Sequence, residues 1–227
     1  MPNKRDHSSG CVPGYEKRTR VQRLFTRIAP RYDYFNRIVS LGLDQGWRKE
    51  TVRRARLSEA DRVLDVCAGT GDLAIMCAKQ KKDEGLVVGV DMNRAMLSYA
   101  QRKYSPNAAS IFWLQSDALA LPFLDCCFDR VMIGFSTRNL TDLMAGVREM
   151  LRVLRPGGSL LILETGYPVN SILRACYQLF LFTFAPLVGF LFTGRIWPFT
   201  YLARSVREFL SPRQVVECLI SANTDAQ

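Results

Sequence analysis

The chain has 227 residues, of which 48% are hydrophobic, and a formal net charge of +10 at pH 7. This length suits one domain, or a domain with an elaboration, and is enough to bury a sizeable core. The single histidine, His7, lies in a polar tail, which argues against histidine base catalysis and against a metal site. The seven cysteines include no C-x-x-C pair and follow no secretory signal, so we expect reduced thiols in a cytoplasmic protein.

The positive charge is concentrated in the front of the chain. Residues 1–62 carry a net charge of +8, with 15 Lys and Arg against 7 Asp and Glu, whereas residues 63–227 carry +2, with 16 against 14. A basic front half suits nucleic acid or an anionic membrane surface. It is also typical of a solvated helical face, an alternative that charge alone slightly favours.

The residues before the first strand predict a helical preface. Residues 1–18 mix Gly and Pro with charges and are expected to form a disordered lead-in. A single domain is expected over residues 19–227, and its helical preface over residues 19–60. There the apolar spacing predicts three helices, over residues 19–29, 31–40 and about 45–56.

Strand, glycine turn and helix come next. Residues 62–66 are a short apolar run, the following turn carries Gly69 and Gly71, and an apolar helical pattern succeeds it. A second predicted strand, residues 86–91, ends in Asp91, whose carboxylate can accept hydrogen bonds from both hydroxyls of a ribose. This order opens a nucleotide-binding βαβ unit, in which glycine lets the backbone approach a ligand closely. The alternative is that the glycines only permit a tight turn.

The spacing of the turn separates two classes of cofactor. A dinucleotide site requires G-x-G-x-x-G, but Ala74 stands at the third glycine position. Asp65, four residues before Gly69, is instead similar to the acid-x-G-x-G-x-G turn of S-adenosylmethionine-dependent methyltransferases, with Cys67 in the first glycine slot. We therefore interpret the turn as a site for the methyl donor, with contacts from Gly69, Thr70 and Gly71.

The rest of the core alternates strands and helices. Asn93 is expected to cap a helix that runs through Lys103, and a second helix is expected from Asp142 to Leu154. Further strands are expected over residues 111–116, 128–135 and 159–164. Residues 62–165 thus predict an α/β fold with a doubly wound parallel sheet, whose ligand binds beyond the carboxyl ends of the strands. That edge carries Thr70, Asp91, Asp117 and the segment after Phe135.

A long uncharged stretch, residues 175–194, follows the core. Its length reaches the threshold for a transmembrane helix, but Pro186 and Gly189 divide it and no second span accompanies it. We interpret residues 170–205 as an apolar insertion that shields an apolar substrate or lies on a bilayer. A last helix is expected over residues 211–221.

The N-terminal part of the chain resembles one family, the quinone-biosynthetic C-methyltransferases that act on demethylmenaquinol and on the related ubiquinone precursor. Residues 32–36 (Tyr-Asp-Tyr-Phe-Asn), followed by Val39-Ser40 and Trp47, are similar to the first signature of this family. The sequence departs from it at Phe35, where methionine is usual, and at Asp44, where histidine is usual.

The resemblance extends from about Phe25 to Leu210. Residues 152–164 are similar to the second family signature. The sequence departs from that signature at Gly166, where serine is usual. Further matching stretches are residues 63–72, 89–93, 121–123 and 133–139. The resemblance implies a class I methyltransferase fold, S-adenosylmethionine as cofactor and a prenylated quinol as substrate. No nucleic-acid partner is expected, because the sequence contains no recognisable RNA-binding module. The resemblance also implies that the cofactor is contacted by Thr70, Asp91, Asp117 and Ala118.

Methylating a ring carbon requires a nucleophilic ring, which the reduced quinol supplies when a hydroxyl proton is lost. Arg138 and Asn139 follow the fourth strand and are candidates for holding the resulting phenolate oxygen. Arginine is a poor base, so the proton acceptor is either Asp33 or a water. The alternative is that Arg138 only pairs with Asp142 at a helix start. An RNA methyltransferase and a cofactor-binding regulator without catalysis are the rival functions.

The end of the chain predicts an unusual sheet. Methyltransferases of this class close the sheet with an antiparallel hairpin, but only residues 221–227 follow the last predicted helix. Seven residues are too few for two strands of ~5 residues each. We therefore expect five parallel strands, with an unpaired fifth strand unless the insertion covers it. An open edge invites association, and a homodimer is one form of it. We expect a cytoplasmic protein loosely attached to the inner membrane face.

Overall fold

The computed structural model describes residues 13–81, 85–104, 111–166, 170–184, 186–187, 190–191 and 197–224. A helical front part precedes the sheet, as the sequence predicts. It comprises α1 (Pro13–Ile28), the 3-10 turn η1 (Ala29–Arg31), α2 (Tyr32–Val39) and α3 (Leu43–Ala55). The turn η1 forms at Pro30, where the sequence predicts the break between the first two helices.

Helix α1 begins earlier than the sequence predicts. The expectation that residues 13–18 belong to a disordered lead-in is wrong, because they form the first turns of α1. Pro13 occupies the first helical position, where its missing N–H costs no hydrogen bond. Leu24, only 3% exposed, fixes the helix against the rest of the protein. Residues 1–12 of the expected lead-in lie outside the described residues.

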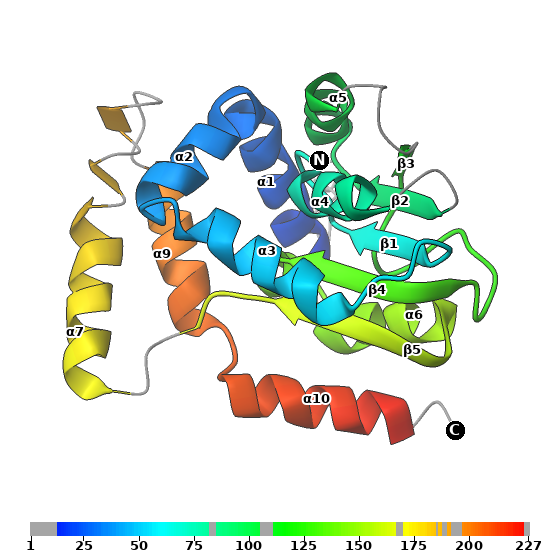
Figure 1. The fold of residues 1–227 in the computed structure, drawn as a ribbon. Helices are drawn as coiled ribbons and strands as arrows, with labels where there is room; N and C mark the ends of the chain where they lie inside the picture. The colour runs from blue at the N-terminus through cyan, green and yellow to red at the C-terminus, as the bar shows by residue number, and fades with distance from the viewer. Residues whose placement is uncertain are drawn as a thin grey trace, which may run out of the picture.

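Five parallel strands form the central sheet (Figure 1). They are β1 (Arg62–Val66), β2 (Leu86–Asp91), β3 (Ile111–Gln115), β4 (Phe128–Gly134) and β5 (Leu154–Leu163). Their order is β3-β2-β1-β4-β5, so the sheet is doubly wound and the prediction of the fold class is confirmed. Val63 of β1 pairs with Val87 of β2 and with Arg130 of β4, which places the glycine turn at the centre of the sheet.

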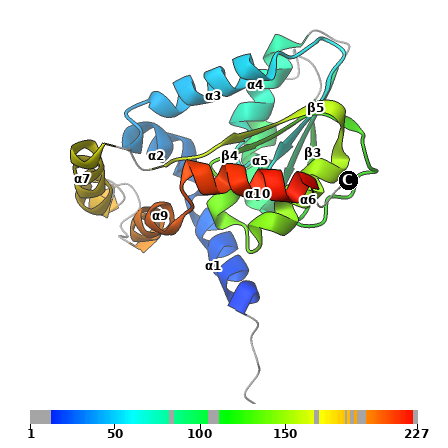
Figure 2. The same ribbon diagram turned by 90° about the horizontal axis from the view of Figure 1, so that it is seen from below.

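Helices cover both faces of the sheet (Figure 2). The connecting helices are α4 (Asp72–Gln80), α5 (Arg94–Lys103) and α6 (Leu143–Val153). Successive side chains of β1 point to opposite faces: Val63 packs with Val52 of α3 and Leu73 of α4, whereas Leu64 packs with Met150 of α6. Because the central strands β1, β2 and β4 are buried on both faces, they are mainly apolar.

Strand β5 starts at Leu154, although the sequence predicts its start at Ser159. The ladder pairs Phe128 with Leu154 and then Arg130 with Ser159, so β5 accommodates the extra residues in a bulge. Gly157 has φ +76° in this bulge, a conformation that glycine adopts without strain. The Pro-Gly-Gly run therefore lies within β5, at its bulge.

The chain after β5 is helical. It forms α7 (Ser171–Leu179), the π-helix η3 (Phe180–Phe184), α9 (Trp197–Glu208) and α10 (Pro212–Thr224). Within the described residues β5 pairs with β4 alone, as the five-stranded prediction requires. Helix α10 packs on α6 (Figure 2), and its Leu219 and Ala222 join the apolar cluster that contains Leu160 and Ile162 of β5. None of the helices in the described part of the chain has the length and apolarity that a membrane crossing needs.

Candidate active site

A cleft opens beyond the carboxyl ends of the strands, at the edge where the sequence predicts a ligand. The turn after β1 and the segments after β2, β3 and β4 line it, and α1 lies across its open side. The predicted cofactor residues that line this cleft are Gly69, Thr70, Asp91, Asp117 and Ala118, and Asn139 lines it from the side of β4. The fold thus brings together residues that are up to 70 positions apart in the sequence.

The turn after β1 depends on left-handed backbone conformations. Cys67, in the first glycine slot of the motif, has φ +56°, Gly69 has φ +58° and Gly71 has φ +82°. Cys67 and Gly69 line the cleft, but Gly71 does not. A Cβ on Gly71 would lie 2.4 Å from the Trp113 ring, so this glycine is required for the turn into α4 and for close packing. Its predicted contact with the cofactor stays a prediction.

The carboxylate of Asp91 is fixed by two backbone groups. Its Oδ2 accepts a hydrogen bond from the Gly69 N–H at 2.8 Å, and its Oδ1 accepts one from the Asn93 N–H at 2.7 Å. Burial raises the pKa of the Asp91 carboxyl above its ordinary value, and the two N–H donors oppose this rise. Each oxygen keeps a free lone pair, so Asp91 can accept hydrogen bonds from both ribose hydroxyls.

Asp117 lies at the end of β3, where the cleft can take an adenine ring. Its Oδ1 accepts a hydrogen bond from the Leu119 N–H at 3.0 Å. Its Oδ2 forms an ion pair with Arg18 of α1 at 2.8 Å. Ala118, 5% exposed, lines the cleft next to this residue. The acceptor that we expect for the adenine amino group is therefore present, and it is paired with the Arg18 guanidinium.

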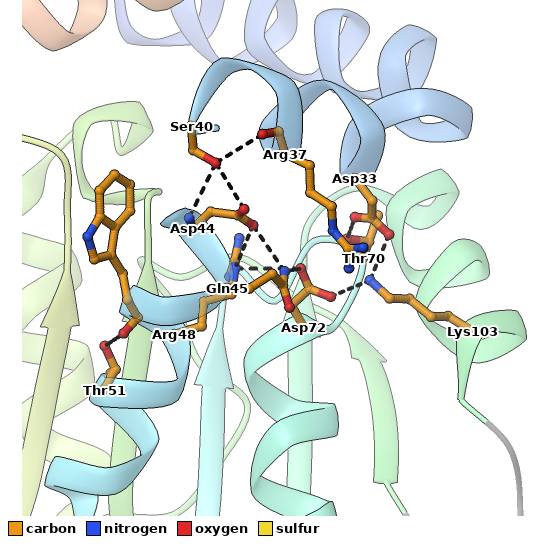
Figure 3. A network of polar contacts seen from close by, with 11 residues as sticks. Asp33, Arg37, Ser40, Asp44, Gln45, Arg48, Thr51, Thr70, Asp72 and Lys103 are labelled. Atoms are coloured by element: carbon orange, nitrogen blue, oxygen red, sulfur yellow. Dashed lines mark hydrogen bonds and ion pairs between the residues drawn. The ribbon is translucent and has the colours of Figure 1, made fainter. Parts of the chain in front are cut away.

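A polar network joins the helical preface to the glycine turn (Figure 3). The Thr70 hydroxyl donates a hydrogen bond to Asp33 Oδ1 at 2.5 Å, and Lys103 Nζ lies 2.6 Å from Asp33 Oδ2. Lys103 also pairs with Asp72, which lies 3.5 Å from the Arg48 guanidinium. Asp33 lines neither this cleft nor the apolar cleft beside it. The structure therefore links Asp33 to Thr70 and not to Arg138.

A second, mainly apolar cleft adjoins the first and shares Tyr32 with it. Its walls come from α2, α3, α7, η3, α9 and the segment after β4, and include Trp47, Phe135, Tyr177, Phe180, Leu181 and Val206. Arg138 is the basic side chain in its lining. We call this the apolar cleft, and the first the cofactor cleft.

Arg138 is buried beside the apolar cleft and paired. It lies in the 3-10 turn η2 (Thr137–Asn139) after β4 and forms an ion pair with Glu164, which follows β5. The Thr137 hydroxyl donates a second hydrogen bond to Glu164 at 2.6 Å. Among the described residues nothing accepts a hydrogen bond from Arg138 Nε. The alternative partner, Asp142, instead caps α6 by accepting from the Ala145 N–H at 2.9 Å.

Asn139 joins the cofactor cleft to α9, the helix that contributes Val206 to the apolar cleft. It lines the cofactor cleft, and its Oδ1 accepts a hydrogen bond from the Tyr201 hydroxyl of α9 at 3.1 Å. Burial raises the pKa of the Tyr201 phenol, so this hydroxyl stays protonated and fixes the orientation of the amide. The amide nitrogen of Asn139 is left to donate a hydrogen bond to another group.

Comparison with known proteins agrees with this geometry. The ubiE/COQ5 methyltransferase family matches residues 15–223. This chain belongs to that family. It is 40% identical to the ubiquinone/menaquinone biosynthesis C-methyltransferase UbiE of Geobacter sulfurreducens, over 88% of this chain and 78% of that protein. It is 41% identical to the demethylmenaquinone methyltransferase of Lactiplantibacillus plantarum, over 86% and 83% of the two chains.

A solved structure shows the same fold for a methyltransferase. The S-adenosylmethionine-dependent methyltransferase of Thermotoga maritima, described as a possible histamine N-methyltransferase, has a TM-score of 0.60 and 18% identity to this chain. The match covers 88% of this chain and 79% of that chain. The prediction of a class I methyltransferase fold is confirmed.

The cofactor cleft of this ubiE/COQ5 methyltransferase fits S-adenosylmethionine. Asp91 and Asp117 offer acceptors for a ribose and an adenine amino group, and the positive φ of Gly69 turns its backbone into the cleft. The turn holds no lysine, and S-adenosylmethionine has no phosphate that would require one.

Sequence reasoning missed three residues of this methyltransferase site. Tyr32 lies at the junction of the clefts, Glu164 pairs with Arg138, and Tyr201 orients Asn139. Tyr32 and Glu164 stand inside the two family signatures, and Glu164 follows the fifth strand at the ligand edge, so both carried a signal. Tyr201 lies in the insertion, outside both family signatures and away from the strand ends, so no feature of the sequence indicated it.

Proposed function

We propose that this methyltransferase transfers a methyl group from S-adenosylmethionine to a ring carbon of a prenylated quinol. The reaction converts demethylmenaquinol to menaquinol, and the related ubiquinone precursor is a second candidate. The observation that carries this proposal is the apolar cleft, which holds one buried guanidinium and meets the cofactor cleft at Tyr32. The names of the two bacterial relatives support the same substrate class.

S-adenosylmethionine supplies an activated methyl group when bound. Gly69, Thr70, Asp91, Asp117 and Ala118 hold it, and Gly71 shapes the turn. The protein then has to place the ring carbon in line with the methyl group and stabilise the charge on the ring oxygen. A methyl transfer of this kind needs no protein nucleophile.

Arg138 and Asn139 stabilise the phenolate oxygen of the quinol. The Arg138 side chain is 8% exposed, and the effect of a positive charge on a developing anion is larger where water is excluded. Glu164 holds one side of the guanidinium, and Nε has no acceptor among the described residues. Asn139 supplies an N–H because Tyr201 occupies its oxygen.

Asp33 acts through Thr70 in this proposal. Its two oxygens are engaged by the Thr70 hydroxyl and by Lys103, and it lines neither cleft. It therefore holds the cofactor turn in place as a positioning residue, and the ring hydroxyl proton leaves to water. Once the ring carbon has accepted the methyl group, its own hydrogen leaves as a proton and the ring oxygen is reprotonated, which restores the aromatic quinol.

We also propose peripheral contact with an anionic membrane at the inner face, where a prenylated quinol resides. Helix α7 and η3 expose a row of large apolar side chains, with Ile172 73%, Leu173 59%, Leu179 66% and Phe182 43% exposed. The front of the chain carries the net charge of +8. Apolar insertion and basic residues act together on an anionic bilayer, each cation near the surface contributing ~1 kcal/mol.

Turnover of Arg138 variants tests the site. Arg138→Ala should lower kcat about 10²-fold or more while the Kd for S-adenosylmethionine stays within about twofold. Arg138→Lys keeps the charge without the planar fork and should recover part of the loss. Unchanged turnover of the alanine variant would remove Arg138 from the mechanism.

A further inference from the structure

A basic groove lies beside the cofactor cleft, between α1 and the residues at the ends of β2 and β3. It has a volume of about 490 Å³ and is lined by Arg18, Thr19, Gln22, Arg23, Thr26, Arg27, Met92 and Gln115. None of these eight residues is acidic, and three are arginines. The groove shares Arg18, Gln22 and Met92 with the cofactor cleft. The two cavities therefore meet at the side chain of Arg18.

The arginines of the groove differ in their partners. Arg18 pairs with Asp117 across the boundary between the cavities, at 2.8 Å. Arg23 and Arg27 are exposed, and neither forms an ion pair with any other residue in the described ranges. Three guanidinium groups around one cavity suit a phosphate, which can accept several charge-assisted hydrogen bonds at once.

We propose that this groove binds the phosphate of an anionic phospholipid headgroup, and that the bound phosphate draws Arg18 away from Asp117. The inference rests on the proposed function for its membrane contact. In the structure the Arg18 guanidinium lies 2.8 Å from Asp117 Oδ2 and competes with an adenine amino group for this carboxylate. A phosphate held by Arg23 and Arg27 offers Arg18 a second anionic partner, which frees Asp117 for the cofactor.

The ion pair between Arg18 and Asp117 is suited to such an exchange. The two side chains are 48% and 22% exposed, and pairs this open to water are weak. Because coupling between two binding sites is reciprocal, the phospholipid should tighten the binding of S-adenosylmethionine and the cofactor should tighten membrane docking. The methyltransferase would then be loaded with its donor where its quinol lies.

A phospholipid fits the groove better than RNA does. The described lining contains no aromatic ring on which a base could stack, and the groove is one cavity rather than a basic track along the surface. Helices α1, α2, α7 and α9 all lie on the side of the carboxyl ends of the strands (Figure 1), so the exposed apolar residues of α7 share that side of the protein.

Calorimetric titration of the full chain with S-adenosylmethionine, without an acceptor, tests the coupling. We expect the Kd to fall roughly two- to fivefold when vesicles of phosphatidylcholine and phosphatidylglycerol are present. Vesicles of phosphatidylcholine alone should leave it unchanged. An unchanged Kd with the anionic vesicles overturns the proposal. The same shift with inorganic phosphate alone, or with a single-stranded RNA, overturns the assignment to a phospholipid.

Three variants distinguish binding of phosphate in the groove from a general effect of the protein's net charge. Arg18→Gln should bind S-adenosylmethionine with the tighter Kd even without vesicles, because Asp117 is already free. Arg23→Gln/Arg27→Gln should keep the Kd measured without vesicles and lose the response to them. The control Arg53→Gln/Arg54→Gln removes the same charge from α3, where both arginines are 71% exposed, and should keep the response.

Two results with these variants contradict the proposal. If the control loses the response as fully as the groove variant does, net charge and not the groove binds the vesicles. If Arg18→Gln weakens the binding of S-adenosylmethionine, Arg18 is a cofactor ligand and not a competitor. Because no acceptor is present, these titrations do not depend on which ring is methylated. Failure of quinol methylation would leave a positive coupling result intact.

Discussion

Glu164 holds Arg138 in an ion pair whose two side chains are 9% and 8% exposed, between the ends of β4 and β5. The carboxylate also accepts hydrogen bonds from the Thr137 hydroxyl and from the Thr165 N–H. The sheet register brings the two strand ends together, since β4 and β5 pair as far as Gly134 and Leu163. The charge that we assign to phenolate stabilisation is therefore positioned by the parallel sheet.

Replacing Glu164 tests this relationship. Glu164→Gln keeps an acceptor for Thr137 but weakens the hold on the guanidinium, so kcat should fall roughly tenfold or more, the size of a lost charge-assisted hydrogen bond of about 1.5–3 kcal/mol. The Kd for S-adenosylmethionine should not change. Glu149→Gln is the control, because Glu149 also pairs with an arginine, Arg152, but lies outside both clefts. Equal loss in the two variants would show a general effect on stability.

Asp33 is expected to affect cofactor binding more than chemistry. Asp33→Ala and Thr70→Val each remove the hydrogen bond of 2.5 Å between these side chains, and each should raise the Kd for S-adenosylmethionine about three- to tenfold. The double variant should be no worse than Asp33→Ala alone, because Thr70→Val removes an interaction that Asp33→Ala has already removed. If Asp33→Ala instead lowers kcat by orders of magnitude and shifts its pH profile, Asp33 is the proton acceptor.

Buried Asp65 should make stability depend on pH. Burial raises the pKa of its carboxyl to about 7, although the Ala74 N–H donates to it and Arg48 lies near. The folded state then binds the proton more tightly than the unfolded state does. The free energy of unfolding should fall as pH rises between about 4 and 7, by up to about 1.4 kcal/mol per pH unit.

Urea denaturation of Asp65→Asn across this pH range measures the effect. The amide can still accept from the Ala74 N–H but cannot ionise, so the variant should gain stability relative to the parent protein as pH rises. Asp142→Asn is the control, since asparagine also caps a helix. Identical pH slopes for Asp65→Asn and the parent protein would contradict the assignment.

The exposed apolar face of α7 should contribute to membrane attachment. Ile172→Asp/Leu179→Asp places charges on side chains that are 73% and 66% exposed, so the fold should tolerate it while flotation with anionic vesicles weakens at least severalfold. Leu124→Asp, at a residue that is 83% exposed in the turn before β4, should float as the parent protein does. High salt should weaken flotation of the parent protein, and equal binding to neutral vesicles would contradict the electrostatic part.

The sequence predicted most of the core because its signals are local. The strand at residues 62–66, the second strand ending in Asp91 and the cap at Asn93 occur as predicted. Each follows from apolar periodicity, a turn residue or a cap within a few positions. The early start of α1 and the bulge in β5 could not be predicted in this way. Both depend on contacts with elements that are distant in the sequence.

The candidate site likewise contains residues that the sequence predicted and contacts that it could not predict. Asp91, Asp117 and Arg138 were found because they follow strands of one parallel sheet. The pairing of Arg138 with Glu164 and of Arg18 with Asp117 joins elements distant in sequence, so only the folded chain shows it. The same holds for Asp33. Its motif suggested a proton acceptor, but in the structure it lies in α2 and accepts a hydrogen bond from Thr70 of the cofactor turn.

Transfer of a labelled methyl group from S-adenosylmethionine tests the central claim most directly. Short-chain demethylmenaquinol, kept reduced, should acquire the label on a ring carbon. The oxidised quinone, whose ring is electrophilic, should acquire none, and neither should bulk tRNA or rRNA. Labelling of RNA alone, or of no acceptor by a protein that binds S-adenosylmethionine, would contradict quinol methylation and favour an RNA methyltransferase or a regulator.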